Sequence, residues 1–245
     1  MKGRRWAALT LALALTLAAA AGAEPLTQAE DLAGQVWEEL NEKASYIYTY
    51  RYPQVEAADS AAEAINSFYR YLAEDAEGFE IPMNADYYRS QGVEQNVTVD
   101  ISYEVTCNNE DYYSVLIWTR QGGVSTVAGH TFSRQGGRAG STVALPYLLG
   151  LLDSGENDTW LQDRQTGKAD ELVRRMVWEK LQEREDMELR EDLTEESLRY
   201  IFYPEEDFYL DATGNPVFYL QPGAADDSDF LTIIPLSVED ILDEM

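Results

Sequence analysis

The sequence predicts an α+β fold, in which an antiparallel sheet meander with packed helices forms two intertwined lobes. Three observations predict it. Some segments place apolar or aromatic residues at every second position, others place them at every third or fourth position, and short turns rich in Gly, Asn or Asp join consecutive strand segments. Hairpin turns between strands favour this class over a doubly wound parallel sheet.

Residues 1–23 have the pattern of a signal peptide. A start with three basic residues precedes an apolar run over 6–20, and Ala21-Gly22-Ala23 forms a small-x-small cleavage site. The apolar run is shorter than the ~20 residues that a membrane-spanning helix needs, so membrane attachment is expected only if the signal remains as an uncleaved anchor. We expect a bacterial protein that is secreted or otherwise extracytoplasmic in the cell envelope.

The segment 24–43 is expected to form an N-terminal helix or stalk. Leu32, Val36 and Leu40 recur at helical spacing, and the residues from Thr27 match the capping box that opens many helices. Side chains four residues apart lie on one face of a helix, which is the basis of this prediction.

Residues 44–153 are expected to form the first α+β lobe. Tyrosines at every second position from 46 to 52 predict a strand whose tyrosines pack beneath a helix, with an aromatic contact surface as the alternative. A helix is expected from Ser60 into the acidic stretch 74–80, and Gly122-Gly123 is expected to turn the chain between two later strands. The further strands predicted in this lobe cover 97–107, 112–120 and 124–133.

Residues 154–245 are expected to form the second lobe, with the loop 154–167 as the boundary. An apolar stripe predicts a helix over 168–183. Another helix is expected to start at Thr194, but Ser197 stands where a full capping box has Glu or Gln, so we expect an incomplete box. The remaining predicted elements are strands over 207–210, 216–220 and 229–234 and a short helix capped by Ser237.

The chain is strongly acidic. It has 18 Lys and Arg against 45 Asp and Glu, which gives a formal net charge of −27 at pH 7. Nucleic acid is therefore excluded as a partner, because phosphate contacts require a surface rich in Lys and Arg. A cationic partner is favoured, since the field of the protein would accelerate its approach; solubility is the plainer explanation of the same charge.

Single copies of cysteine and histidine limit the possible chemistry. Cys107 lies on the apolar phase of a strand and is expected to be a buried thiol, since a catalytic cysteine needs a base and a lowered pKa. His130 is the sole histidine, so a Ser-His-Asp triad would depend on it, and no G-x-S-x-G elbow is present. We expect a structural histidine, no zinc or other metal site, no cofactor and no enzymatic activity.

The acidic residues leave further possibilities to weigh. Paired carboxylates cleave glycosidic bonds in many hydrolases, but sequence spacing selects no pair here. Acidic clusters at 153–158 and 226–229 do not match the calcium loop of an EF-hand, and we expect solvated loops. The Gly-rich stretch 136–142 lacks the Lys of a phosphate loop and is expected to be a turn.

Several segments in this order resemble the extracytoplasmic domain of RsiV-type anti-sigma factors and the non-catalytic N-terminal region of PdaC-type peptidoglycan deacetylases, domains without an assigned chemistry. The resemblance covers about residues 44–243. The chain departs from this family at residues 124–126, where Val-Ser-Thr follows the Gly-Gly pair and family members commonly carry a histidine. The segments that carry the resemblance are Tyr50–Val55, Val97–Arg120 with Gly122-Gly123, His130–Phe132 before the Gly136-Gly137 turn, Phe208–Leu220 and Phe230–Leu236.

The resemblance implies an exported cell-envelope binding or sensing module. RsiV members bind host lysozyme, so the expected partner is a cationic, lysozyme-like protein, or else peptidoglycan or another glycan. No sigma-binding segment precedes residue 6 and no deacetylase domain follows residue 245, so we expect neither a complete anti-sigma factor nor a deacetylase. The alternative is a carboxylate-based hydrolase of peptidoglycan or glycan. The residues expected at the binding surface are Tyr112, Tyr113, Trp118, Arg120, Gly122 and Gly123.

Overall fold

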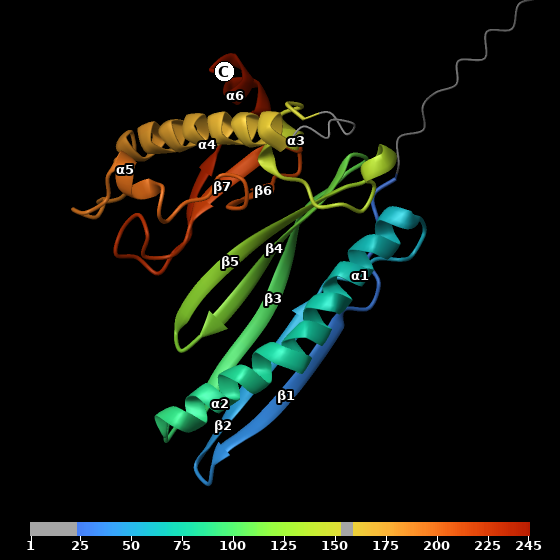
Figure 1. Cartoon of the computed structure of the whole chain (residues 1–245), viewed down its shortest axis with the longest axis vertical. Helices are drawn as coiled ribbons and strands as arrows, with labels where there is room; N and C mark the ends of the chain where they lie inside the picture. Colours follow the sequence, from blue (N-terminus) through green and yellow to red (C-terminus); the bar gives the residue numbers. More distant parts are fainter. Residues whose placement is uncertain (1–23, 153–158) are drawn as a thin grey trace, which may run out of the picture.

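The computed structural model describes residues 24–152 and 159–245, so the predicted signal peptide lies outside it. The chain forms a five-stranded sheet and a three-stranded sheet with helices packed against both, which confirms the α+β class (Figure 1). The strands of the first sheet follow the order of the chain: β1 (Leu32–Asn41), β2 (Ala44–Tyr52), β3 (Val97–Asn108), β4 (Tyr112–Gln121) and β5 (Val124–Ser133).

The first sheet is mixed: the antiparallel meander predicted over 97–133 is confirmed, but a parallel pair precedes it. β2 and β3 are parallel, with Tyr46 opposite Val97, whereas the pairs β1–β2, β3–β4 and β4–β5 are antiparallel. The chain leaves β2 and returns along a long helix on one face of the sheet, so β3 starts at the same end as β2. Such a crossover is how parallel strands are connected.

The predicted helix over 24–43 is a strand. β1 pairs with β2 along its whole length and forms one edge of the sheet. Leu32, Val36 and Leu40 do share a face, but so do Gly34 and Glu38 between them, with a period of two. A spacing of four residues fits a helix and a strand alike, and the tyrosine strand β2 offers a partner that decides for the strand. The segment belongs to the first core and is not a stalk.

The tyrosines of β2 form the centre of the first core. All four of their side chains are buried on the face that the long helix covers. The ring of Tyr52 stacks on Tyr50 and on Tyr69 of the helix, with centroids 5.7 Å apart in each case. Aromatic pairs at such distances stabilise a core beyond the area that they bury. The tyrosine stripe is therefore core and not a contact surface.

The helix after β2 is longer than predicted. α1 (Ser60–Asp75) begins at the N-cap Asp59, whose carboxylate accepts the Ala62 N–H at 2.8 Å. It continues through a π turn, η1 (Ala76–Glu80), into α2 (Ile81–Gln91). The acidic stretch that was expected to close the helix has exposed side chains, so its charges do not interrupt the backbone hydrogen bonds.

The second lobe packs helices against the small antiparallel sheet (Figure 1). The predicted inward face of its long helix is confirmed at Leu172, Val173, Val177 and Leu181, which are buried. No helix within 24–152 and 159–245 is both long and apolar enough to cross a membrane. The elements are α3 (Leu145–Leu148), α4 (Thr159–Gln182), α5 (Glu195–Leu198), β6 (Phe208–Leu210), β7 (Pro216–Leu220), β8 (Thr232–Pro235) and α6 (Val238–Asp243).

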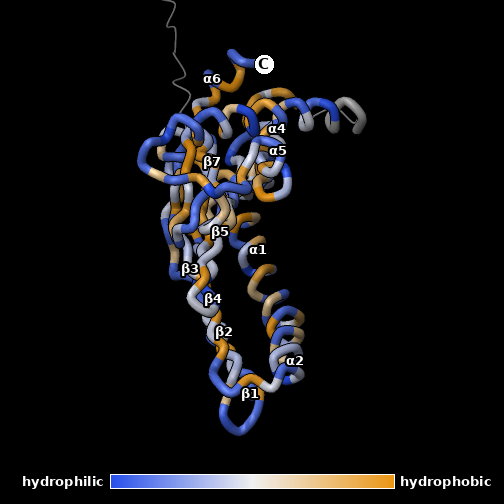
Figure 2. Tube along the Cα trace, turned by 90° about the vertical axis from the view of Figure 1, so that its left-hand side faces the viewer, coloured by the Kyte–Doolittle hydropathy of each residue, from blue (hydrophilic) through white to orange (hydrophobic). Residues whose placement is uncertain are grey.

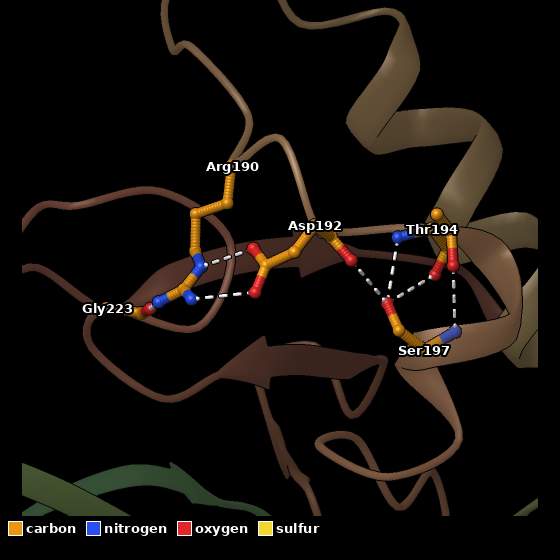
Figure 3. A network of polar contacts seen from close by, with 5 residues as sticks. All are labelled: Arg190, Asp192, Thr194, Ser197 and Gly223. Carbon is orange, nitrogen blue, oxygen red and sulfur yellow. Dashed lines mark hydrogen bonds and ion pairs between the residues drawn. The ribbon is translucent and has the colours of Figure 1, made fainter.

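The cap of α5 is complete, contrary to our expectation. The Thr194 N–H donates to Ser197 Oγ at 2.8 Å, and the Ser197 N–H donates to Thr194 Oγ1 at 3.1 Å (Figure 3). A serine hydroxyl can thus accept the hydrogen bond that Glu or Gln accepts in the usual capping box. Beside it, the Arg190 guanidinium binds Asp192 and donates to the Gly223 carbonyl at 3.0 Å, which holds two loops together.

The two lobes share buried residues. Cys107 and the segment 143–149, both from the predicted first lobe, contribute side chains to the core of the second. Ser114 Oγ of β4 accepts the Leu210 N–H of β6 at 3.0 Å and lies 2.9 Å from Thr131 Oγ1 of β5. The predicted intertwining therefore consists of β6 lying against β4 and β5.

Gly129 of β5 makes the closest approach between the lobes. A Cβ atom at this position would overlap the carbonyl oxygen of Phe208 in β6. Because this neighbour is backbone, it cannot move aside as a flexible side chain would. Only glycine therefore allows β6 to lie this close to β5.

We expect Gly129→Ala to lower the free energy of unfolding by about 1–3 kcal/mol, since overpacking a tight contact costs this much. Urea unfolding of the purified protein would measure it. Gly78→Ala is the control, because an added Cβ there meets no atom within 4 Å and lies in a helical segment, so it should stabilise the protein by about 0.5–1 kcal/mol. Equal stability of Gly129→Ala and the unsubstituted protein would contradict the close contact.

Candidate functional site

β5 is an edge strand whose outer edge is covered by side chains and by a short bridge. The Val127 N–H and carbonyl are both bound by the amide of Gln221, at 3.0 and 2.8 Å. The Gly129 N–H donates to the hydroxyl of Tyr219 at 2.9 Å. Further along, the Thr131 carbonyl accepts the Val143 N–H at 2.8 Å. The end of β7 and the segment after β5 thus replace a sixth strand.

This covering leaves a gap between Gly129 and Thr131. In an antiparallel pair, the backbone groups of alternate residues point away from the partner strand. The backbone groups of Gly129 and Thr131 point away from β4, because the Gly129 N–H binds Tyr219 and the Thr131 carbonyl binds Val143. The other outward groups of the two residues, the Gly129 carbonyl and the Thr131 N–H, therefore face the space beyond the edge.

That space is a cleft of about 490 Å³ between the lobes. It is lined by β5, by the loop into β6 and by the segment 142–144. Both the backbone groups of Gly129 and Thr131 and the acidic residues Glu205–Asp207 line this cleft. Its lining residues are Val127–Thr131, Thr142–Ala144, Glu205–Phe208 and Tyr219.

Three consecutive acids, Glu205, Glu206 and Asp207, line the cleft opposite β5. A turn after α5 positions them: Asp207 Oδ2 accepts the Tyr203 N–H at 2.7 Å, and the Asp207 carbonyl accepts the Tyr219 N–H at 3.1 Å. Burial raises the pKa of the Asp207 carboxyl to about 6, and the neighbouring Glu206 adds to the increase.

A fourth carboxyl lies close behind this row. Burial raises the pKa of Asp170 in α4 to about 6, Glu205 raises it further, and Arg174 opposes the increase. Asp170 Oδ1 is buried without a hydrogen-bond partner. Half-buried carboxylates with raised pKa values gain stability when a positive charge approaches them. The acidic wall is therefore suited to a cationic group.

His130 lies in β5 but its ring belongs to the first core. It packs against Phe68 and Tyr69 of α1, with ring centroids 5.1 and 5.8 Å away. Burial lowers the pKa of its imidazole to about 4, so the ring is neutral at pH 7. Its Nδ1 atom is buried and has no hydrogen-bond partner. This environment matches the structural histidine expected from the sequence.

Two acidic clusters, at 153–158 and 226–229, were predicted to be solvated loops. The cluster at 153–158 lies outside the described residues. At 226–229, Asp226 accepts hydrogen bonds from the Ser228 N–H and hydroxyl at 3.1 and 2.6 Å, so it stabilises its own turn. Among the residues that the structure describes, no group of three or more His, Cys, Asp or Glu could hold a metal ion.

The six residues predicted to form a binding surface do not share one surface. Tyr113 is fully buried in the first core, where its hydroxyl accepts a hydrogen bond from Gln28 at 3.1 Å, so it cannot contact a partner. Tyr112, Trp118 and Arg120 lie on the opposite face of β4. Tyr112 and Trp118 are half-buried against the second lobe, and Arg120 is exposed.

Gly122 and Gly123 form the turn between β4 and β5, as predicted, with φ angles of 60° and 87° that favour glycine. Gly122 lines a second hollow of about 550 Å³, between α2 and this hairpin. Gln121 crosses the hollow and donates to the Tyr88 hydroxyl at 2.8 Å. Of the six predicted residues, only Gly122 lines this hollow. The other lining residues are Tyr88, Asn96–Thr98, Thr119, Gln121, Val124 and Thr126.

The residues of the cleft were not identified from the sequence. Glu205, Glu206 and Asp207 are three of 45 acids, and no spacing distinguishes them. The sequence around Tyr219 and Gln221 predicts only the end of a strand. Their contact with β5 depends on how the two lobes pack together, which the sequence does not indicate. The only local signal is an acidic run directly before a strand.

Comparison with known proteins gives a likeness in structure only. No family model and no curated protein matches the sequence. A DUF3298 family member from Bacteroides fragilis has a TM-score of 0.48 and 12% identity, over 89% of this chain and 93% of its own. A DUF3298 family protein from Pseudomonas aeruginosa PAO1 has a TM-score of 0.43 and 13% identity, over 89% and 94%. The structural neighbours are thus DUF3298 family proteins.

The raised pKa of Asp207 makes the stability of the protein depend on pH. The folded protein holds this proton more tightly than the unfolded chain, in which the pKa is near 3.8. The stability contribution of Asp207 therefore falls as pH rises from about 4 to about 6. We expect Asp207→Asn to gain stability relative to the unsubstituted protein across this range, as measured by urea unfolding at pH 4, 5, 6 and 7.

Asp186→Asn is a control of opposite sign. Arg184 lowers the pKa of Asp186, so this carboxylate contributes stability above pH ~4 and loses it as the pH falls further. The Asp186→Asn variant should therefore lose stability relative to the unsubstituted protein as the pH rises through this value. If Asp207→Asn showed the same trend, burial of the Asp207 carboxyl would be contradicted.

Proposed function

We propose that this chain is an exported bacterial cell-envelope module that binds a cationic protein of the lysozyme type, without catalysis. The observation that carries the proposal is the cleft at the edge of β5. It sets an outward-facing backbone carbonyl and N–H, at Gly129 and Thr131, opposite three carboxyl groups. An extended peptide segment with a Lys or Arg side chain matches both walls, because its amides pair with the edge and its cation meets the acids.

The charge of the whole protein supports the same partner. A net charge of −27 attracts cationic proteins over distance and accelerates their encounter. Exposed aromatic side chains lie close to the acidic row in sequence: Tyr200 and Tyr203 precede it, and Asp207 binds the backbone of Tyr203. Tyrosine is enriched among residues that dominate protein interfaces. Placement outside the cytoplasm rests on the pattern of residues 1–23.

Calorimetric titration with a c-type lysozyme, at low and at physiological salt, tests this function. We expect a one-to-one complex that weakens with salt yet persists at physiological strength, since the Debye length falls from ~30 Å at 0.01 M to ~8 Å there. Heat that appears only at low salt would indicate nonspecific attraction between opposite charges. The absence of heat at both would exclude lysozyme as the partner.

Matched variants test whether the cleft is the site. Glu205→Gln with Glu206→Gln should weaken binding by about 10-fold, which corresponds to ~1.4 kcal/mol. Glu56→Gln with Glu110→Gln removes the same charge from exposed positions of the first lobe. Equal weakening by both pairs would show that net charge alone drives binding and would refute the cleft as the site.

One observation favours a second function, a hydrolase of peptidoglycan or glycan. Asp207 has a pKa of about 6 and stands beside Glu206 in a cleft that Tyr219 also lines. A protonated carboxyl next to an ionised one is the arrangement of acid and stabilising carboxylate in glycosidases.

Release of reducing ends from purified peptidoglycan at pH 5 to 7 would measure this activity. A hydrolase should lose release by at least about 100-fold on Asp207→Asn, the scale of general acid catalysis, while it still binds the wall. Failure of the unsubstituted protein to release sugar would end this alternative and leave the binding function untouched.

A further inference from the structure

The long helix of the first lobe exposes large apolar side chains on its outer side. Phe79, Met83 and Tyr87 follow one another at four-residue intervals, and Tyr71 precedes them by two turns. These four side chains, here called the outer stripe, are 64%, 52%, 56% and 64% exposed in that order. Residues four apart lie on one helical face. The outer stripe runs about 24 Å along the helix, at 1.5 Å per residue.

The π turn brings the first two residues of the outer stripe, Tyr71 and Phe79, towards one face of the helix. Tyr71 and Phe79 are eight residues apart, which in a regular α-helix would rotate them by about 80° relative to each other. The π turn η1, which contains Phe79, has more residues per turn than an α-helix, so it brings Phe79 closer to the face of Tyr71. The same shift keeps Ala73 and Ile81 together on the buried side. The π turn thus brings Tyr71 and Phe79 together, whereas from Phe79 to Tyr87 the outer stripe drifts by about 80° around the regular helix α2.

An apolar outer face is unusual for a helix that covers a sheet. The inward face of α1 and α2 is already buried against β1, β2 and β3, and Figure 2 shows no other element covering the outer side. A surface helix normally has polar residues opposite its core face. Exposed apolar residues in an aligned row, rather than scattered singly, mark interaction surfaces.

Acidic side chains flank the outer stripe. Glu74, Asp75, Glu80 and Asp86 are all exposed on the same helical stretch. Partial burial raises the pKa of the Glu80 carboxyl and the nearby Asp75 raises it further, so two negative charges lie close together. Two guanidiniums lie on the same helical stretch: Arg70 is exposed beside Tyr71, and Arg89 is engaged by Glu38 at 2.8 Å and by Asp86 at 2.5 Å.

We propose that the outer stripe is a docking surface for a basic amphipathic helix of a partner protein. The apolar face of that helix would cover Tyr71, Phe79, Met83 and Tyr87, and its Lys and Arg side chains would meet the flanking acids. The net charge of −27 opposes the other two occupants, an anionic membrane and a second copy of this chain. None of the four residues lines the cleft at β5, so this surface is independent of the proposed function.

The probe is an 18-residue peptide of Leu and Lys with its leucines on one helical face. We expect it to bind the purified protein one-to-one at physiological salt in fluorescence anisotropy, and to gain helicity in circular dichroism. Phe79→Ser, Met83→Ser and Tyr87→Ser together should weaken binding at least 10-fold. These side chains are exposed, so the variant should keep the midpoint of thermal unfolding.

Tyr200→Ser with Phe230→Ser is the matched control, because both side chains are exposed and lie outside the outer stripe. It should bind the peptide as the unsubstituted protein does. Equal affinity of the stripe variant, or no binding by the unsubstituted protein, would overturn the proposal. So would a dimer in sedimentation that the stripe substitutions abolish, or flotation of the protein with vesicles of phosphatidylglycerol and phosphatidylcholine.

Discussion

The rest of the structure depends on the middle of β4, residues 113–117, being buried from both sides. One face of β4 places Tyr113, Val115 and Ile117 in the first core, and its other face places Leu116 against Tyr219 of the second lobe. A strand covered on both faces has consecutive apolar residues instead of alternating ones. Each lobe therefore supplies a layer that the other needs, and we expect the two lobes to unfold together.

The sequence predicts those elements whose pattern fits one period only. The tyrosine strand and β5 were predicted closely, since their alternation excludes a helix. The four-residue spacing of Leu32, Val36 and Leu40 fits both periods, so only pairing with β2 could decide it. The parallel β2–β3 pair and the acidic cleft depend on contacts between segments that are distant in the sequence. No local pattern of residues predicts such contacts.

Electrostatics in the second lobe are divided between local pairs and an open acidic wall. Arg184 and Arg190 each bind an aspartate two residues further on, at 2.6 and 2.9 Å. Exposed pairs of this kind contribute ~0.2–1 kcal/mol and chiefly hold turns. Asp207 in the cleft and Asp170 behind it are instead half-buried, and burial raises the pKa of both carboxyls. A partner that brings positive charge would relieve a cost that the folded chain already carries.

Both edges of the large sheet end in side chains rather than in further strands. Arg89 donates to the Glu39 carbonyl of β1 at 2.9 Å, and Gln221 and Tyr219 occupy the outward groups of β5. Uncovered edges are templates on which identical chains polymerise. Side-chain caps at both edges therefore hinder pairing with identical chains, and they leave one short opening in the β5 edge, at Gly129 and Thr131.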